Sequence, residues 1–353
     1  KSINVSKFII KISFIYPYSI KTLILIKKKN LSVFIFFVLQ VFFLDAYGSS
    51  KKVDEKINSE DKLEKKYFPT TNVKGSLFFT LGALSESTSS ESLHFTYENK
   101  IRLNTSFKGT DNLLTVFESG NALDSPLMLD LQSKKGDNLK ISTLLYKFQL
   151  DDEYEAIIGP KMFGYHGLAG KSTAYNERIA ILDGSNYTTS SGIGPGIGIS
   201  KRKKNGLNAS FKIASDSSQI DNESIHFINQ IGLTKKNFGG TITTNLNNDF
   251  EAYGIATFYK PKNFPSISAS IEYKDMDSGK TIKNWVFALQ QGLQNKKIGI
   301  AVGTYNSEEK IGYEGWSEIN ISDKLKIIPV FFVRETNKVN PELGFSINTK
   351  FSY

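Results

Sequence analysis

Apolar and polar residues alternate with a period of two along most of the chain after residue 69. The stretch 343–353 shows this most clearly: its odd-numbered positions are apolar or aromatic except for Thr349, and its even-numbered positions are Gly, Ser, Asn or Lys. Residues 93–107 show the same alternation over an even longer stretch. A period of two places alternate side chains on opposite faces of a β-strand. The pattern therefore predicts strands with one apolar and one polar face.

The alternation predicts a chain made almost entirely of such strands. The predicted strands are 74–83, 93–108, 112–121, 139–150, 153–162, 193–201, 207–215, 225–235, 238–246, 251–260, 265–274, 282–293, 297–305, 312–321, 325–333 and 342–353. Most are long enough for a tilted membrane strand, which needs about 9–11 residues. Sixteen is an even number, as bacterial outer-membrane barrels prefer. Strands of a soluble β-protein, the alternative, rarely need the length of 93–107.

The links between these strands tend to alternate between short and long. The short link 109–111 is followed by the long link 122–138, and the short link 151–152 by the longest one, 163–192. The brief link 247–250 is an exception. Outer-membrane barrels have short periplasmic turns and longer outer loops. The alternation therefore predicts that both ends of the barrel region lie on the periplasmic side.

A membrane explains why such strands would close into a barrel. In hydrocarbon every backbone N–H and C=O must be paired within the protein, so a sheet can span only as a closed barrel. We therefore predict an all-β, transmembrane, antiparallel β-barrel of about sixteen strands. A barrel of this size is too wide for its inward side chains to fill, so an aqueous channel is expected.

The N-terminal region has the features of a secretory signal. Three lysines at 27–29 precede the apolar run 31–44, and Ala46 and Gly48 supply the small residues of a cleavage site. The run is shorter than the roughly 20 residues of a spanning helix. We predict that residues 1–48 are removed, the alternative being a retained membrane anchor.

Charge supports a division of the chain into three parts. The net charge is +9, but residues 1–50 contain seven lysines and a single acidic residue, Asp45, and so carry six of these charges. The remainder is only weakly basic, and we expect no nucleic-acid partner. Residues 49–73 are predicted to be a short charged periplasmic segment, and 74–353 the barrel.

Composition restricts the possible chemistry. The chain has no cysteine, and His94, His166 and His226 are too dispersed for a metal site. The glycine-rich run 193–199 resembles a phosphate-binding loop only superficially, because no helix pattern follows it; strand curvature is the better explanation. We therefore predict no metal, no cofactor and no enzymatic activity, a barrel-embedded hydrolase being the remaining alternative.

Several segments carry a family resemblance. Residues 101–113, 118–121, 144–152 and 157–160 are similar to cyanobacterial outer-membrane porins of the iron-uptake or inorganic-ion type, which are related to carbohydrate-selective porins. The resemblance covers about 74–353. It implies an outer-membrane location and a homotrimer. We expect the barrel without the N-terminal surface-layer-homology domain that family members usually carry.

The last strand also resembles the closing strand of bacterial outer-membrane barrels. Its alternate apolar residues are the predicted signal for the barrel-assembly machinery. These residues are Phe345, Ile347, Phe351 and Tyr353.

The loop 163–192 is the predicted site of selectivity. In general porins the corresponding loop folds into the barrel and narrows it, and rings of charge at a constriction set ion preference. The alternative is a loop that only covers the outer mouth. The constriction candidates in the loop are Lys171, Tyr175, Glu177, Arg178 and Asp183. The candidates on the facing wall are Glu98, Lys100, Arg102 and Glu118.

These features together favour an outer-membrane porin for the passive diffusion of small hydrophilic solutes, with inorganic ions as the expected cargo. The partners implied are outer-membrane lipid and the permeating ions or solutes. Two alternatives stay open: a carbohydrate-selective porin, and a structural barrel that conducts poorly.

Overall fold

The part of the chain that the structure describes forms a closed barrel. The computed structural model describes residues 69–85, 93–123, 125–129, 136–170, 172–175, 179–182, 188–189, 193–216, 225–305, 310–336 and 340–353. The expected signal segment, 1–48, lies outside these residues, as does the charged segment up to residue 68. Within the described ranges, no helix is long and apolar enough to cross a membrane.

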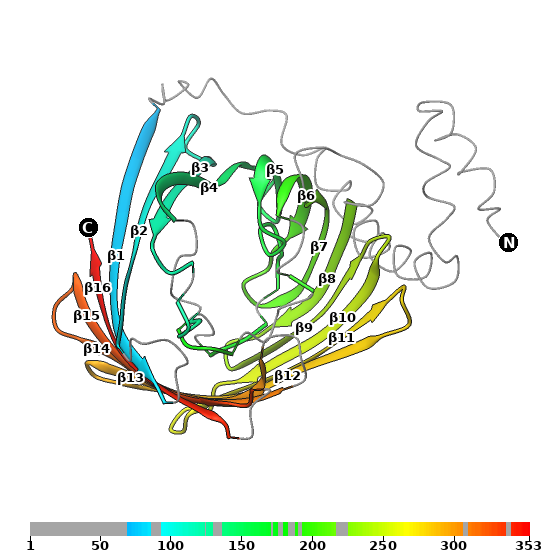
Figure 1. Ribbon diagram of the computed structural model, residues 1–353. Helices are drawn as coiled ribbons and strands as arrows, with labels where there is room; N and C mark the ends of the chain where they lie inside the picture. The colour runs from blue at the N-terminus through cyan, green and yellow to red at the C-terminus, as the bar shows by residue number, and fades with distance from the viewer. Residues whose placement is uncertain are drawn as a thin grey trace, which may run out of the picture. The chain divides into compact units, whose positions relative to one another are not determined.

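Sixteen antiparallel strands follow one another around the barrel (Figure 1). The first eight are β1 (Thr70–Leu84), β2 (Leu93–Ser106), β3 (Asp111–Gly120), β4 (Gly136–Gln149), β5 (Tyr154–Met162), β6 (Gly194–Lys201), β7 (Gly206–Ser215) and β8 (Ile225–Thr234). The last eight are β9 (Phe238–Leu246), β10 (Phe250–Tyr259), β11 (Ser266–Met276), β12 (Thr281–Leu293), β13 (Lys296–Tyr305), β14 (Lys310–Asn320), β15 (Leu325–Arg334) and β16 (Glu342–Ser352). Strand β1 pairs with both β2 and β16, which closes the barrel.

The predicted all-β, antiparallel, sixteen-stranded barrel is confirmed, with small differences at strand ends. Strand β1 begins at Thr70, four residues before the expected start, because Thr70 and Thr71 pair with the end of β2. The hydroxyl oxygens of Thr71 and Thr105 lie 2.9 Å apart. These polar residues lack the apolar alternation, which is why the pattern alone did not include them.

Side chains alternate between an apolar outer face and a mostly polar inner face. On β16, Phe345 and Ile347 point outward and are 47% and 44% exposed in the isolated chain. The alternate residues of the same strand, Ser346 and Asn348, point inward and are fully buried. The side-chain amide of Asn348 accepts a 2.7 Å hydrogen bond from Thr80 of β1. An apolar outer face and a polar interior are what a barrel in lipid requires.

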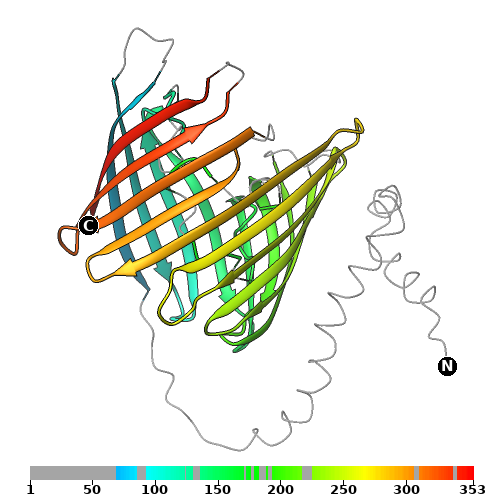
Figure 2. The ribbon, with the colours of Figure 1, turned by 90° about the horizontal axis from the view of Figure 1, so that it is seen from below.

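The two ends of the barrel differ. The short turns at 107–110, 150–153 and 294–295 lie at one end, together with the start of β1 and the end of β16, as Figure 2 shows for β16. The links 121–135 and 163–193 lie at the other end. The links 247–249 and 277–280 at that same end are brief.

Candidate functional site

The link between β5 and β6 folds into the barrel, as predicted. Its residues 179–182 are buried and belong to one hydrophobic cluster with the inner faces of β12–β15, including Val286, Trp316 and Phe332. Figure 1 shows the green segment that follows β5 inside the ring of strands. An apolar patch on the inner wall would be unfavourable in a water-filled lumen, and the link covers it.

One buried carboxylate binds three groups of this link. Glu314 of β14 is buried, and its Oε2 accepts hydrogen bonds of 2.8 Å from the backbone N–H groups of both Ile181 and Leu182. Its Oε1 accepts a 2.6 Å hydrogen bond from the hydroxyl of Tyr175. The indole N–H of Trp316 donates to the same hydroxyl at 2.7 Å. We call Glu314, Tyr175 and Trp316 the latch.

Neighbouring strands supply further acceptors for the backbone of the link. The hydroxyl oxygen of Ser268 on β11 accepts hydrogen bonds from the N–H groups of Ala174 and Tyr175, at 3.0 and 3.2 Å. The amide oxygen of Gln230 on β8 accepts one from Gly170 at 2.7 Å. Buried backbone N–H groups are costly without partners, so these contacts define the path of the link across the lumen.

The link between β3 and β4 is also tied to the inner wall. Arg334 of β15 donates to the carbonyl oxygens of Leu127 and Pro126, at 3.1 and 2.6 Å, and forms a 2.9 Å ion pair with Glu342. Leu127 and Leu129 join the same hydrophobic cluster. Two links together thus fill the β12–β15 side of the lumen.

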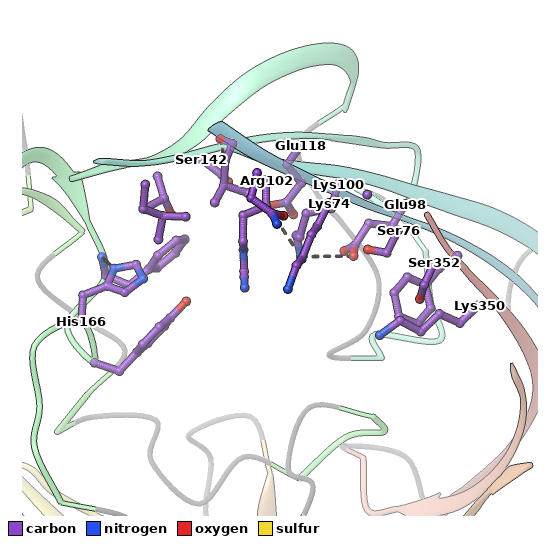
Figure 3. A pocket seen from close by; sticks show the side chains of 18 of the residues that line it. Lys74, Ser76, Glu98, Lys100, Arg102, Glu118, Ser142, His166, Lys350 and Ser352 are labelled. Atoms are coloured by element: carbon purple, nitrogen blue, oxygen red, sulfur yellow. Dashed lines mark hydrogen bonds and ion pairs between the residues drawn. The ribbon is translucent and has the colours of Figure 1, made fainter. Parts of the chain in front are cut away.

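The space left open lies on the opposite side. A cavity of about 1120 Å³ is lined by residues of β1–β4 and the end of β16, and across from them by link residues such as Phe163, Tyr165 and His166. Figure 3 shows Lys74, Lys100 and Arg102 on the strand wall, with His166 on the link at the other side of the opening. The passage through the barrel therefore runs between the inward link and this wall.

Cations outnumber anions around the cavity. Its described lining includes five Lys or Arg side chains but only two carboxylates, Glu98 and Glu118. The five cations are Lys74, Lys100, Arg102, Lys324 and Lys350. Lys100 is partly neutralised, because its Nζ lies 3.1 Å from a carboxylate oxygen of Glu98 and 4.0 Å from one of Glu118. The net positive charge of the wall comes from the other four.

The structure brings together the four wall residues expected from the sequence: Glu98, Lys100, Arg102 and Glu118 all line the cavity. Of the loop candidates, Tyr175 is buried in the latch and is not part of the cavity lining. The remaining loop candidates lie outside the described residues; they are Lys171, Glu177, Arg178 and Asp183. On β16 and just after it, Phe345, Ile347, Phe351 and Tyr353 form the exposed outer row.

Sequence reasoning missed three cations of the wall and the carboxylate of the latch. The pattern puts Lys74 at the very start of a strand and Lys350 on the polar face of the last one, and it does not show that both line one cavity. The register between strands is the missing information. In the closed sheet Phe78 of β1 lies opposite Glu98 of β2 on one side and Lys350 of β16 on the other, and this brings Lys350 to the same wall as Glu98. In the sequence, Glu314 is a charged residue between Gly312 and Trp316 on the face of its strand that points inward. Nothing in the sequence connects it to residue 175.

Among the described residues, no group of three or more His, Asp or Glu side chains is arranged to hold a metal ion. The charged groups of the wall act as fixed charges on a passage, and the cavity is open rather than enclosed in a protein core.

Comparison with known proteins supports the fold. No protein-family model and no curated protein sequence matches the chain. A double mutant of the porin of Rhodopseudomonas blastica is similar in structure, with a TM-score of 0.54, 9% sequence identity, and coverage of 80% of this chain and 100% of that one. A triple mutant of the same porin gives a TM-score of 0.53 with the same identity and coverage. The chain thus has the fold of a bacterial porin.

Proposed function

We propose that this protein is an outer-membrane porin, which forms a water-filled channel for the passive diffusion of small hydrophilic solutes. The observation that carries the proposal is the cavity between the inward link and the β1–β4 wall, inside a closed barrel with an apolar outer face. A closed barrel satisfies its backbone groups in lipid, while charged inward residues keep the passage hydrated.

Inorganic ions are the proposed cargo, and anions the preferred ones. The excess of Lys and Arg over Glu in the described lining makes the local potential positive, which raises the local concentration of anions in a narrow passage. Rings of charged side chains select ions in this manner in channels generally. We propose no catalytic role for the barrel.

A carbohydrate-selective channel is the second candidate, because one observation favours it. The rings of Phe163 and Tyr165 stack with their centroids 5.4 Å apart and an interplanar angle of 9°, and both residues line the cavity. Such a pair offers a flat apolar surface on which a sugar ring could pack. The third candidate is a structural barrel that conducts poorly. It is supported by the two inward links, which occupy part of the lumen and so narrow the passage.

The cellular setting is proposed from the sequence. The homotrimer, the cyanobacterial origin, the removal of residues 1–48 and the periplasmic N-terminus all stay predictions that rest on the resemblance and on the pattern of links. Outer-membrane lipid and the barrel-assembly machinery are the proposed partners during biogenesis.

Planar-bilayer recording of the purified protein tests the proposal. We expect discrete, long-lived conductance steps and, in a KCl gradient, a reversal potential displaced toward the chloride equilibrium potential. A reversal potential displaced toward potassium would refute the anion preference. Reversible block by maltose-type oligosaccharides but not by salts would favour the carbohydrate channel. Folded protein without steps at any voltage would favour the structural barrel.

A further inference from the structure

Two cations of the wall face each other directly across a strand pair. Lys74 of β1 and Arg102 of β2 are register partners in the antiparallel ladder, and both extend into the cavity, as Figure 3 shows. Directly opposed side chains in such a ladder have Cβ atoms about 4.5–5.5 Å apart, and like charges there destabilise the sheet. A like-charge pair at this position therefore has no structural benefit of its own.

Three other inward-facing cations nearby, Lys100, Lys326 and Lys350, each have a partner, which distinguishes them from Lys74 and Arg102. Lys100, the next inward residue on β2, pairs with Glu98 at 3.1 Å. Lys326 of β15 faces Lys350 in the ladder, yet it is held by Glu318 at 2.8 Å. Lys350 itself lies over the ring of Phe78, 4.9 Å from its centroid.

Lys74 and Arg102 have no such compensation. Among the described residues, no carboxylate lies within ion-pair distance of either side chain, and both are exposed to the open cavity. Their inward neighbours in the ladder toward the rim are Asn72 and Asn104, another directly opposed pair. Of these two asparagines, Asn72 lines the cavity, so the two positive charges and one amide are available to a polyvalent oxyanion.

The chemistry of the two side chains indicates the ligand. A guanidinium presents a planar fork that matches the oxygens of a phosphate, and an ammonium adds a compact point charge. A single chloride needs only one of these charges, whereas a doubly charged tetrahedral oxyanion can use both. Because both side chains point into the lumen, the ligand would come from solution and not from a lipid headgroup.

We propose that Lys74 and Arg102 form a binding site for doubly charged phosphate, through which the channel captures this oxyanion during passage. The inference rests on the proposed porin function and deepens it by naming a substrate class. The site lies on the short-turn side of the cavity, near the start of β1 and the end of β2. Its occupancy by phosphate relieves the repulsion between the two cations.

Block of chloride current by inorganic phosphate tests the site. The full-length protein is recorded in KCl at mildly alkaline pH, where phosphate is mostly a dianion, and phosphate is titrated in. We expect a saturable fall in chloride conductance, and a rise of about tenfold in the half-blocking concentration for Arg102→Gln and for Lys74→Gln, since charge-assisted hydrogen bonds are roughly twice as strong as neutral ones. Lys324→Gln, which removes an exposed charge from the same cavity, is the matched control.

The variants also separate a lost site from a lost fold. Both Gln substitutions remove a like-charge repulsion, so we expect the melting temperature of the barrel to stay constant or rise. An equal loss of block in Lys324→Gln would overturn the site in favour of a general positive field. Glycerol 3-phosphate, added in place of inorganic phosphate, distinguishes the source: equal block supports a site for any phosphate group, and weaker block supports one for the free ion.

Failure of the site and failure of the porin function give different results. A channel that conducts chloride but is not blocked by phosphate would overturn the site alone. Protein that does not conduct would contradict the porin function, and calorimetric titration of inorganic phosphate into the detergent-solubilised variants then decides the site. Binding weakened by Arg102→Gln but not by Lys324→Gln would support it, and absence of binding to the unsubstituted protein would overturn it.

Discussion

The hydroxyl of Tyr175 donates a 2.6 Å hydrogen bond to Oε1 of Glu314, across 139 positions of the sequence. The carboxylate lies in the apolar surroundings of the hydrophobic cluster on β12–β15, where a charge without hydrogen bonds would be very costly. Tyr175, Ile181 and Leu182 supply its donors. If the link moved away from the wall, the carboxylate would lose these donors, so Glu314 favours the position of the link that the structure shows.

Replacing Glu314 tests this function of the latch. A glutamine has one acceptor oxygen instead of two, so in Glu314→Gln either the proton of the Tyr175 hydroxyl or the two N–H donors lose their acceptor. We expect the barrel to lose about 2 kcal/mol of stability and the open-channel current noise to rise several-fold as the link moves. The control is Glu318→Gln, which removes an inward carboxylate that binds Lys326 instead. Equal noise in the two variants would contradict the latch.

Close packing under the cluster gives a stability prediction. A Cβ added at Gly344 would overlap the ring of Phe332, a fully buried residue of the cluster, whereas one added at Gly292 would meet nothing within 4 Å. We expect Gly344→Ala to destabilise the barrel by about 1–3 kcal/mol, the usual cost of overpacking, and Gly292→Ala to have little effect. Thermal unfolding in detergent measures both. Identical melting temperatures would show that β16 can shift to make room.

An aromatic row crosses the seam where the barrel closes. The ring of Phe79 on β1 stacks on Phe95 of β2, at 6.1 Å, and contacts Phe351 of β16 edge-on, at 6.3 Å. Aromatic pairs contribute about 0.5–1.5 kcal/mol each beyond their buried area. We therefore expect Phe79→Ala to lower barrel stability by about 1–3 kcal/mol more than Phe287→Ala, another outward phenylalanine. Urea unfolding in lipid vesicles would measure the difference. Equal losses of unfolding free energy in the two variants would mean that the aromatic row does not stabilise the seam.

Removing a carboxylate from the wall should strengthen the proposed preference for anions. Glu98 holds Lys100 at 3.1 Å, so Glu98→Gln frees a positive charge in the cavity. We expect the reversal potential in a salt gradient to move further toward chloride. The shift should be larger at about 0.1 M than at about 1 M salt, because the Debye length falls from about 10 to about 3 Å. A shift independent of salt would indicate a change in the shape of the passage instead.

The strand pattern was predictable because lipid acts on each strand separately. Outward residues such as Phe345 and Ile347 must be apolar and inward ones such as Asn348 polar, and this demand appears within a single strand as a period of two. The wall candidates Glu98, Lys100 and Arg102 followed from the same parity. Strand ends such as Thr70 were missed because residues beyond the hydrocarbon are under no such demand.

The sequence by itself determined the sixteen strands, which side chains point inward, and the position of the longest link, since each is a local property of alternation or length. That this link enters the barrel was an expectation from general porins, and the structure decided it against a loop that only covers the mouth. Only the tertiary structure decided which inward residues meet. Register around the closed sheet places Lys74 opposite Arg102, and the path of the link brings Tyr175 to Glu314. Both relationships depend on contacts between segments distant in the chain, whose free energy is gained only once the barrel has closed and the link has packed inside it.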